Sequence, residues 1–209
     1  MLLFFIKVLL RIDGMTYFNT RDVAAIAICA ALWGVLNSIF APVFFSMTHL
    51  PFFCDLIGFS VLTLAAWWVR KFGAITIVGA IATVINFAMV PNAVHFLGFT
   101  AASILFDLTI SVVGFNKPFS KKAYTVASMM PISIVSAALA GYIIGTFFMA
   151  GPALAPVGGV LGWAALHMVG GVVGGAIGVS LVTGLDARKV AVRSSRYKEA
   201  QPNFMRDSK

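Results

Sequence analysis

The fold is decided by residues 50–90, which read LPFFCDLIGFSVLTLAAWWVRKFGAITIVGAIATVINFAMV. Two apolar runs flank the cationic pair Arg70–Lys71, and each approaches the roughly 20 residues that a helix needs to cross a bilayer. Trp67 and Trp68 precede the pair, in the order of aromatic belt and cationic anchor that is typical of a membrane interface. The stretch therefore predicts two membrane helices, at about residues 50–69 and 73–90, joined by a cytoplasmic turn.

The same alternation extends over the whole chain. All 15 Lys and Arg residues lie in four segments, which are 7–21, Arg70–Lys71, 117–122 and the tail from Arg188. Three apolar hairpins lie between these segments, and their outer loops contain no Lys or Arg. Because cytoplasmic loops retain Lys and Arg, the pattern predicts an all-α integral membrane bundle of six helices with both termini in the cytoplasm. The other four helices are expected at about 21–40, which ends before Pro42, and at 95–114, 123–149 and 156–184.

Composition supports this class and bounds the domain organisation. The chain has 209 residues, of which 60% are hydrophobic and 11% charged, as expected of a multi-pass protein of the cell membrane. We expect residues 1–19 to form a cytoplasmic or interfacial segment, 20–185 a single membrane domain, and 186–209 a basic cytoplasmic tail. The net charge of +8 fits contact with anionic lipid headgroups, so nucleic acid is not an expected partner.

Small residues mark two helix faces on which close packing is expected. The last helix has Gly170, Gly174 and Gly178 at steps of four, which we interpret as packing within the bundle. The first helix has Ala27, Ala31 and Gly34 on one stripe. For this stripe two interpretations stay open: packing within the bundle, or docking of another membrane subunit.

Residues 20–32, TRDVAAIAICAAL, resemble the first helix of the substrate-binding (S) components of energy-coupling factor (ECF) transporters. The resemblance implies a six-helix protein that captures a vitamin or vitamin precursor. It also implies that Ala27 and Ala31 match an Ala-x-x-x-Ala pattern that docks on a transmembrane coupling subunit, which works with two ATPase subunits. Residues 67–74, WWVRKFGA, are similar to the helix 2–3 junction of the hydroxymethylpyrimidine/thiamine subgroup. In this family the loop corresponding to residues 40–49 acts as a lid over the ligand.

Ionisable and polar groups within the spans are the candidate ligand contacts, because such groups usually face the bundle interior. Asp55 is either an interfacial acid or a pocket acid. For Asp107 and His167, at similar depth, three possibilities stay open: a structural pair, part of the binding floor, or no contact at all. Further polar and aromatic residues cluster toward the outer side, where they predict a pocket for a planar heterocycle. The complete predicted substrate-binding set is Trp33, Asn37, His49, Asp55, Asn86, Asn92, His95, Asp107, Trp163 and His167.

The absence of ATP-binding and catalytic motifs from the sequence excludes some classes of function. The sequence has no Gly-x-x-x-x-Gly-Lys-Ser/Thr loop, so ATPase partners would have to supply any ATP-driven step. It has neither His-Glu-x-x-His nor Gly-x-Ser-x-Gly, so we expect neither an enzyme nor a protein cofactor. The chain begins Met1–Leu2, whereas the nickel/cobalt branch of the family begins Met-His, so no metal site is expected. The alternative to the S component is a stand-alone secondary carrier or small channel that works without ATPase partners.

Overall fold

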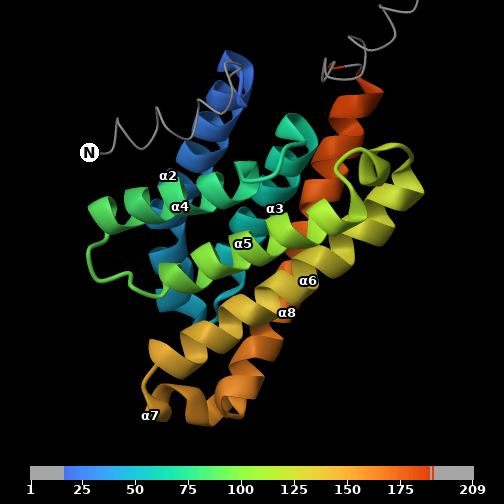
Figure 1. Ribbon diagram of the computed structural model, residues 1–209. Coiled ribbons are helices and arrows are strands. Elements are labelled where there is room, and N and C mark those ends of the chain that lie inside the picture. The colour runs from blue at the N-terminus through green and yellow to red at the C-terminus, as the bar shows by residue number, and fades with distance from the viewer. Residues whose placement is uncertain (1–16, 189, 191–209) are drawn as a thin grey trace, which may run out of the picture.

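The computed structural model describes residues 17–188 and 190, and within them the chain is helical without strands (Figure 1). The long helices are α2 (Thr20–Thr48), α3 (Phe52–Val69), α4 (Ala74–Met89), α5 (Phe96–Val113), α6 (Lys122–Phe147) and α8 (Gly159–Ala187). The short elements are η1 (Lys117–Phe119), α7 (Gly151–Leu154) and η2 (Ala155–Val157). All the long helices except α4 are long and apolar enough to cross a membrane. The prediction of an all-α, multi-pass membrane protein is thus confirmed.

Helix α3 lies at the centre of the described bundle. It contacts each of the other long helices, and most extensively α8 and α2. Around it the packing continues from α2 to α4, from α4 to α5, from α5 to α6 and from α6 to α8. Figure 1 shows the start of α2 and the end of α8 at the top of the view, with α7 and the start of α8 at the bottom. A side chain at either end of α3 can therefore meet several other helices.

Glycines allow α8 to lie between α3 and α6. A Cβ added to Gly170 would be 2.5 Å from Cβ of Asp55 on α3, and one added to Gly171 would be 2.6 Å from Cβ of Ala137 on α6. Both distances are shorter than any real carbon contact, so only glycine permits this approach. Such close packing replaces the hydrophobic driving force that is missing between helices in lipid. The predicted packing role of the glycines of α8 within the bundle is confirmed.

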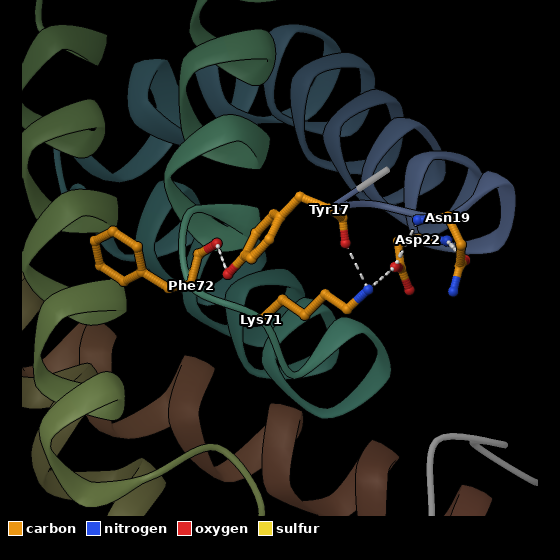
Figure 2. A network of polar contacts seen from close by, with 5 residues as sticks. All are labelled: Tyr17, Asn19, Asp22, Lys71 and Phe72. Carbon is orange, nitrogen blue, oxygen red and sulfur yellow. Dashed lines mark hydrogen bonds and ion pairs between the residues drawn. The ribbon is translucent and has the colours of Figure 1, made fainter. Parts of the chain in front are cut away.

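The turn between α3 and α4 is bound to the start of α2 (Figure 2). The ammonium Nζ of Lys71 lies 2.7 Å from Oδ2 of Asp22 and donates a hydrogen bond of 2.7 Å to the carbonyl of Tyr17. Asp22 and Asn19 also form a capping box, in which each side chain accepts a hydrogen bond from the backbone N–H of the other residue. The same carboxylate thus caps α2 and holds the next cationic segment against it.

The other described cationic segments meet at this end of the bundle. The guanidinium of Arg70 lies 5.3 Å from the centre of the Phe119 ring in η1. Trp67 on α3 donates a hydrogen bond of 3.0 Å from Nε1 to Asp186 near the end of α8. The described parts of all four cationic segments therefore lie at one end, which we call the cationic end.

Helix α2 is longer than expected. It continues through Pro42 to Thr48, and the chain leaves the helix at His49, whose φ is 56°. Membrane helices accommodate proline because neighbouring groups satisfy the carbonyl that proline leaves free. The expectations that the helix ends before Pro42 and that residues 40–49 form a loop are both wrong, since residues 40–48 are helical.

The remaining helix boundaries agree with the expected ones to within three residues. Helix α4 is two residues shorter than expected, with 16 residues. Helix α8 ends at Ala187, so the first two residues of the predicted tail are helical. Most of the predicted N-terminal segment and tail, residues 1–16, 189 and 191–209, lies outside the described residues.

Candidate ligand-binding site

A cavity of about 340 Å³ lies at the end of the bundle opposite the cationic end. Its walls come from the last turns of α2, α4 and α6, the first turns of α3, α5 and α8, and the loop between α4 and α5. The lining is largely aromatic and aliphatic. It comprises Asn37, Ser38, Ala41, Pro42, Phe45, Ser46, Pro51, Cys54, Asn86, Val90, Asn92, Ala93, His95, Phe96, Phe99, Ile144, Met149, Trp163 and His167. Among residues 17–188 and 190, no Lys, Arg, Asp or Glu lines the cavity.

An amide cluster forms one wall between α2 and α4. Oδ1 of Asn86 accepts hydrogen bonds from Ser38 Oγ at 2.8 Å and from Asn37 Nδ2 at 3.3 Å. Nδ2 of Asn86 donates to the carbonyl of Ala82 at 2.8 Å, which fixes the orientation of this amide. Oδ1 of Asn37 is buried and has no partner among the described residues. The cluster therefore leaves one hydrogen-bond acceptor free at the cavity wall.

A buried histidine–carboxylate pair lies on the other side of the cavity. Nδ1 of His167 on α8 lies 3.0 Å from Oδ1 of Asp55 on α3, and the two residues are 1% and 0% exposed. The imidazole ring lies between Trp163, at 5.6 Å between ring centres, and Phe99, at 5.8 Å. Nε2 of His167 and Nε1 of Trp163 are buried without partners among the described residues. Both residues line the cavity, and the hydrogen-bonding capacity of these two nitrogens is unused among the described residues.

The local sequence explains why a carboxylate is tolerated at position 55. Asp55 lies in the first turn of α3, where the partial positive charge of a helix N-terminus stabilises an anion. Gly170 on α8 makes room for it, because any larger residue would overlap Oδ2 of Asp55. Asp55 itself does not line the cavity, so it reaches a ligand only through His167.

Asp107 is not part of the cavity, and of the three possibilities for Asp107 and His167 the structure has the third, no contact between them. Its Oδ2 accepts hydrogen bonds from the backbone N–H of Thr76 at 3.0 Å and from Thr76 Oγ1 at 2.9 Å. Helix α4 begins after Gly73, which offers no side-chain cap, so Asp107 on α5 caps α4 from outside the helix. We therefore assign Asp107 a structural role at the half of the bundle nearer the cationic end.

The other predicted contacts divide into two groups. Those that line the cavity are Asn37, Asn86, Asn92, His95, Trp163 and His167. Trp33 lies instead in the core, fully buried, with its ring 6.1 Å from that of Phe99. His49 is exposed after the end of α2 and does not line the cavity. The outer-side cluster expected from the sequence is thus a real neighbourhood, but Trp33, His49, Asp55 and Asp107 do not face its interior.

His95 precedes α5 in the loop at the cavity mouth. Burial, followed by the nearby His167, lowers the pKa of His95 from its ordinary value to about 4. The imidazole is therefore uncharged at neutral pH and adds no positive charge at the mouth.

The predicted docking stripe on α2 is only partly exposed. Ala27 and Ala31 face outward, beside the exposed Ile28 and Val23. Gly34 is buried against α4, where an added Cβ would lie 2.8 Å from Cβ of Ile85. The assignment of Gly34 to the docking face is wrong, because this glycine packs α2 on α4.

Several lining residues were missed in the sequence. Phe99 lies one helical turn after His95, so helical spacing could have indicated it. Ser38 follows Asn37 directly, and adjacent residues on a helix do not share a face, so its position gave no such signal. Phe45 and Ser46 lie in the segment that the resemblance placed over the ligand, but they were not named as individual contacts. Cys54 gave no signal in the sequence, because a free cysteine usually behaves as a small apolar residue.

Comparison of the chain with models of protein families, with curated proteins and with solved structures finds no match. The function is therefore inferred from the geometry of the cavity and from the resemblance of residues 20–32 and 67–74 to S components.

Proposed function

We propose that this protein is the membrane-embedded substrate-capture component of an ATP-driven, ECF-type uptake transporter in the cell membrane. Its ligand is a vitamin or vitamin precursor, with hydroxymethylpyrimidine and thiamine as the first compounds to test. The observation that carries the proposal is the cavity, which is lined by Asn37, Trp163 and His167, each with a buried polar atom that has no partner among the described residues.

The cavity has the properties of a small-molecule site. Its volume of about 340 Å³ lies in the lower part of the range for ligand pockets, about 300–1,000 Å³. Phe96, Phe99 and Trp163 provide flat apolar surfaces on which a planar ring can stack. Among the described residues nine buried side-chain polar atoms have no partner, and the three on Asn37, Trp163 and His167 belong to residues that line this cavity, where a ligand can satisfy them.

The proposal includes six membrane crossings with the cationic end in the cytoplasm. Helix α4 contributes about 24 Å at 1.5 Å per residue, a mismatch that local thinning of the bilayer accommodates. The positive-inside rule then places the cavity on the outer side.

The orientation is tested by cysteine labelling. Cys29 and Cys54 are replaced by alanine, and Ser46→Cys or Lys121→Cys is added. An impermeant maleimide applied to intact cells should label only the first variant; labelling of only the second would reverse the orientation.

The exposed Ala27 and Ala31 form the proposed docking face for the transmembrane coupling subunit. In a complex with that subunit and two ATPase subunits, Ala27→Trp and Ala31→Trp should abolish co-purification while leaving ligand binding unchanged. Val112→Trp is the matched control. Val112 is 88% exposed on α5, a helix that packs mainly on α6 and α4. Co-purification and uptake that survive both alanine substitutions would contradict the docking face.

The central experiment identifies the ligand. Native mass spectrometry of the purified chain should detect a retained small molecule, and isothermal titration should then measure its affinity, starting with hydroxymethylpyrimidine and thiamine. Asn37→Leu removes the free acceptor and Phe99→Ala removes part of the stacking wall, so each should weaken binding at least tenfold, whereas Val112→Ala should not. If no vitamin-like compound binds the folded wild-type chain, the capture function is wrong.

A stand-alone secondary carrier or small channel is the second candidate. One observation favours a carrier: acidic and imidazole groups buried together in a membrane are a common feature of proton relays, and Asp55 and His167 form such a pair. Vesicles containing only this chain distinguish the two functions. Concentrative uptake driven by a pH gradient, without ATPase subunits, would establish the carrier and exclude dependence on the ATP-driven complex.

A further inference from the structure

The pair of Asp55 and His167 is isolated from every other described charge. Arg70 follows Asp55 by 15 residues on the same helix, which is roughly 22 Å along the axis. The other described Lys and Arg residues also lie in the segments that meet at the cationic end. The remaining titratable groups that line the cavity next to the pair are Cys54 and His95. No described cation other than His167 itself can therefore neutralise the carboxylate.

We propose that the Asp55–His167 pair holds one shared proton, so that its net charge is zero and Nε2 of His167 is a hydrogen-bond donor to the ligand. This inference rests on the proposed function, because it assigns the chemistry of the same cavity. An ionised carboxylate beside a neutral imidazole would leave a net negative charge in the bundle, which is costly without a counter-ion. One additional proton removes that charge.

Nε2 of His167 carries a proton wherever the shared proton lies between Asp55 and Nδ1. If the pair is ionic, Nδ1–H of the imidazolium donates to the carboxylate, and Nε2 carries the second proton. If the pair is neutral, the protonated carboxyl donates to Nδ1, and the single imidazole proton is on Nε2. Both arrangements fit the 3.0 Å separation, and both leave a proton on Nε2 of this cavity-lining residue. Asp55 is thus a positioning residue that acts on the ligand through His167.

The three free polar atoms then define the ligand's hydrogen-bonding pattern. Nε2 of His167 and Nε1 of Trp163 are donors, whereas Oδ1 of Asn37 is an acceptor. The ligand class that fits is an uncharged, planar N-heterocycle with two acceptors, such as unprotonated ring nitrogens, and one N–H or O–H donor. Of the two compounds named above, it favours hydroxymethylpyrimidine over thiamine, which carries a permanent positive charge. A ligand that places an ammonium group against His167 would meet a donor instead of an acceptor.

Nuclear magnetic resonance of the full chain tests the protonation directly. The chain contains only three histidines, so labelling with ¹⁵N-histidine in lipid nanodiscs gives few ring signals. The ¹⁵N shift separates a protonated ring nitrogen from an unprotonated one. At pH 7 we expect Nε2 of His167 to be protonated. An unprotonated Nε2 with a protonated Nδ1 would overturn the proposal, whether or not a ligand is known.

Variants make the assignment secure. His167→Gln should remove the ring signals of His167 and so assign them. If this variant does not fold, the double variant His49→Gln, His95→Gln should retain only the signals of His167, which assigns them by elimination. Asp55→Asn is the informative substitution, because its amide can donate to Nδ1 and preserve an uncharged pair. We expect Nε2 to stay protonated in this variant; a change of Nε2 to the unprotonated form would also contradict the proposal.

Binding provides a separate outcome. Hydroxymethylpyrimidine is an uncharged probe of the right pattern, and we expect Asp55→Asn to bind it within about threefold of wild type. His167→Phe keeps an aromatic ring but removes the donor, and should weaken binding about tenfold or more. Affinity that is unchanged in His167→Phe would overturn the donor role. A protonated Nε2 without binding of any heterocycle would leave the proton assignment intact and refute the capture function instead.

Discussion

Nδ1 of His167 on α8 lies 3.0 Å from Oδ1 of Asp55 on α3, and both side chains are excluded from solvent. The contact joins the central helix of the bundle to the helix with which it packs most closely. It also lies directly behind the cavity, since His167 lines the cavity and Asp55 does not. One polar pair therefore connects helix packing with the candidate binding site.

The pair should show strong coupling in a double-mutant cycle. Asp55→Leu or His167→Leu leaves one buried ionisable group without its partner, and we expect each to lower the free energy of unfolding by about 3 kcal/mol. The double variant should lose much less than the sum, because no unpaired group remains. Thermal and denaturant unfolding in detergent measure the three values. Additive losses would show that the two side chains do not interact.

The contact between Gly170 and Asp55 should tolerate no added methyl group. Gly170→Ala should destabilise the bundle by about 2 kcal/mol or more, because its Cβ would overlap the Asp55 side chain. Gly184→Ala is the matched control on the same helix, since nothing lies within 4 Å of its added Cβ. The control should be neutral or slightly stabilising, because alanine has the higher helix propensity. Equal melting temperatures of the two variants would contradict the α3–α8 packing.

Asp107 should affect stability without affecting the ligand. Asp107→Ala removes both hydrogen bonds to Thr76 and leaves the start of α4 without its cap, so we expect a loss of about 1–2 kcal/mol. The affinity for a ligand identified by mass spectrometry should stay within twofold of wild type. A large loss of affinity at unchanged stability would show that Asp107 contributes to ligand binding.

The contact of Lys71 with Asp22 should contribute modestly. The Lys71 side chain is 34% exposed, and partly exposed ion pairs contribute about 1 kcal/mol or less. Lys71→Met should therefore lower the melting temperature slightly, and high salt should reduce the difference. Asp22→Ala should be more damaging, because it also removes the capping box of α2. If Lys71→Met were the more damaging of the two, the capping role of Asp22 would be in doubt.

His95 should make stability depend on pH. Its folded-state pKa of about 4 lies below its ordinary value, so the folded protein binds fewer protons than the unfolded chain between those values. The contribution is fully present above about pH 6.5 and is lost as the pH falls toward 4. The free energy of unfolding, measured at pH 7 and at pH 5, should fall less between these pH values for His95→Gln than for wild type. His49→Gln, at an exposed position outside the cavity, should behave like wild type.

How far the site could be predicted depends on helix rotation. The sequence placed Asn37, Asn86, Asn92, His95 and Trp163 toward one end, and these residues do line one cavity, which His167, expected deeper in the bilayer, also lines. It did not predict that Asp55, rather than Asp107, lies beside His167. The helices are apolar on nearly all sides, so periodicity says little about which side chains face each other.

The sequence by itself determined the class of protein, the helix boundaries to within a few residues at most ends, and the gathering of cations at one end. These follow from local quantities: the length of apolar runs and the positions of Lys and Arg. Only the tertiary structure decided that Pro42 lies inside α2, that Gly34 packs on α4, and that His167 pairs with Asp55. Those outcomes depend on close contacts between helices that are distant in sequence, and no single helix contains the information to specify them.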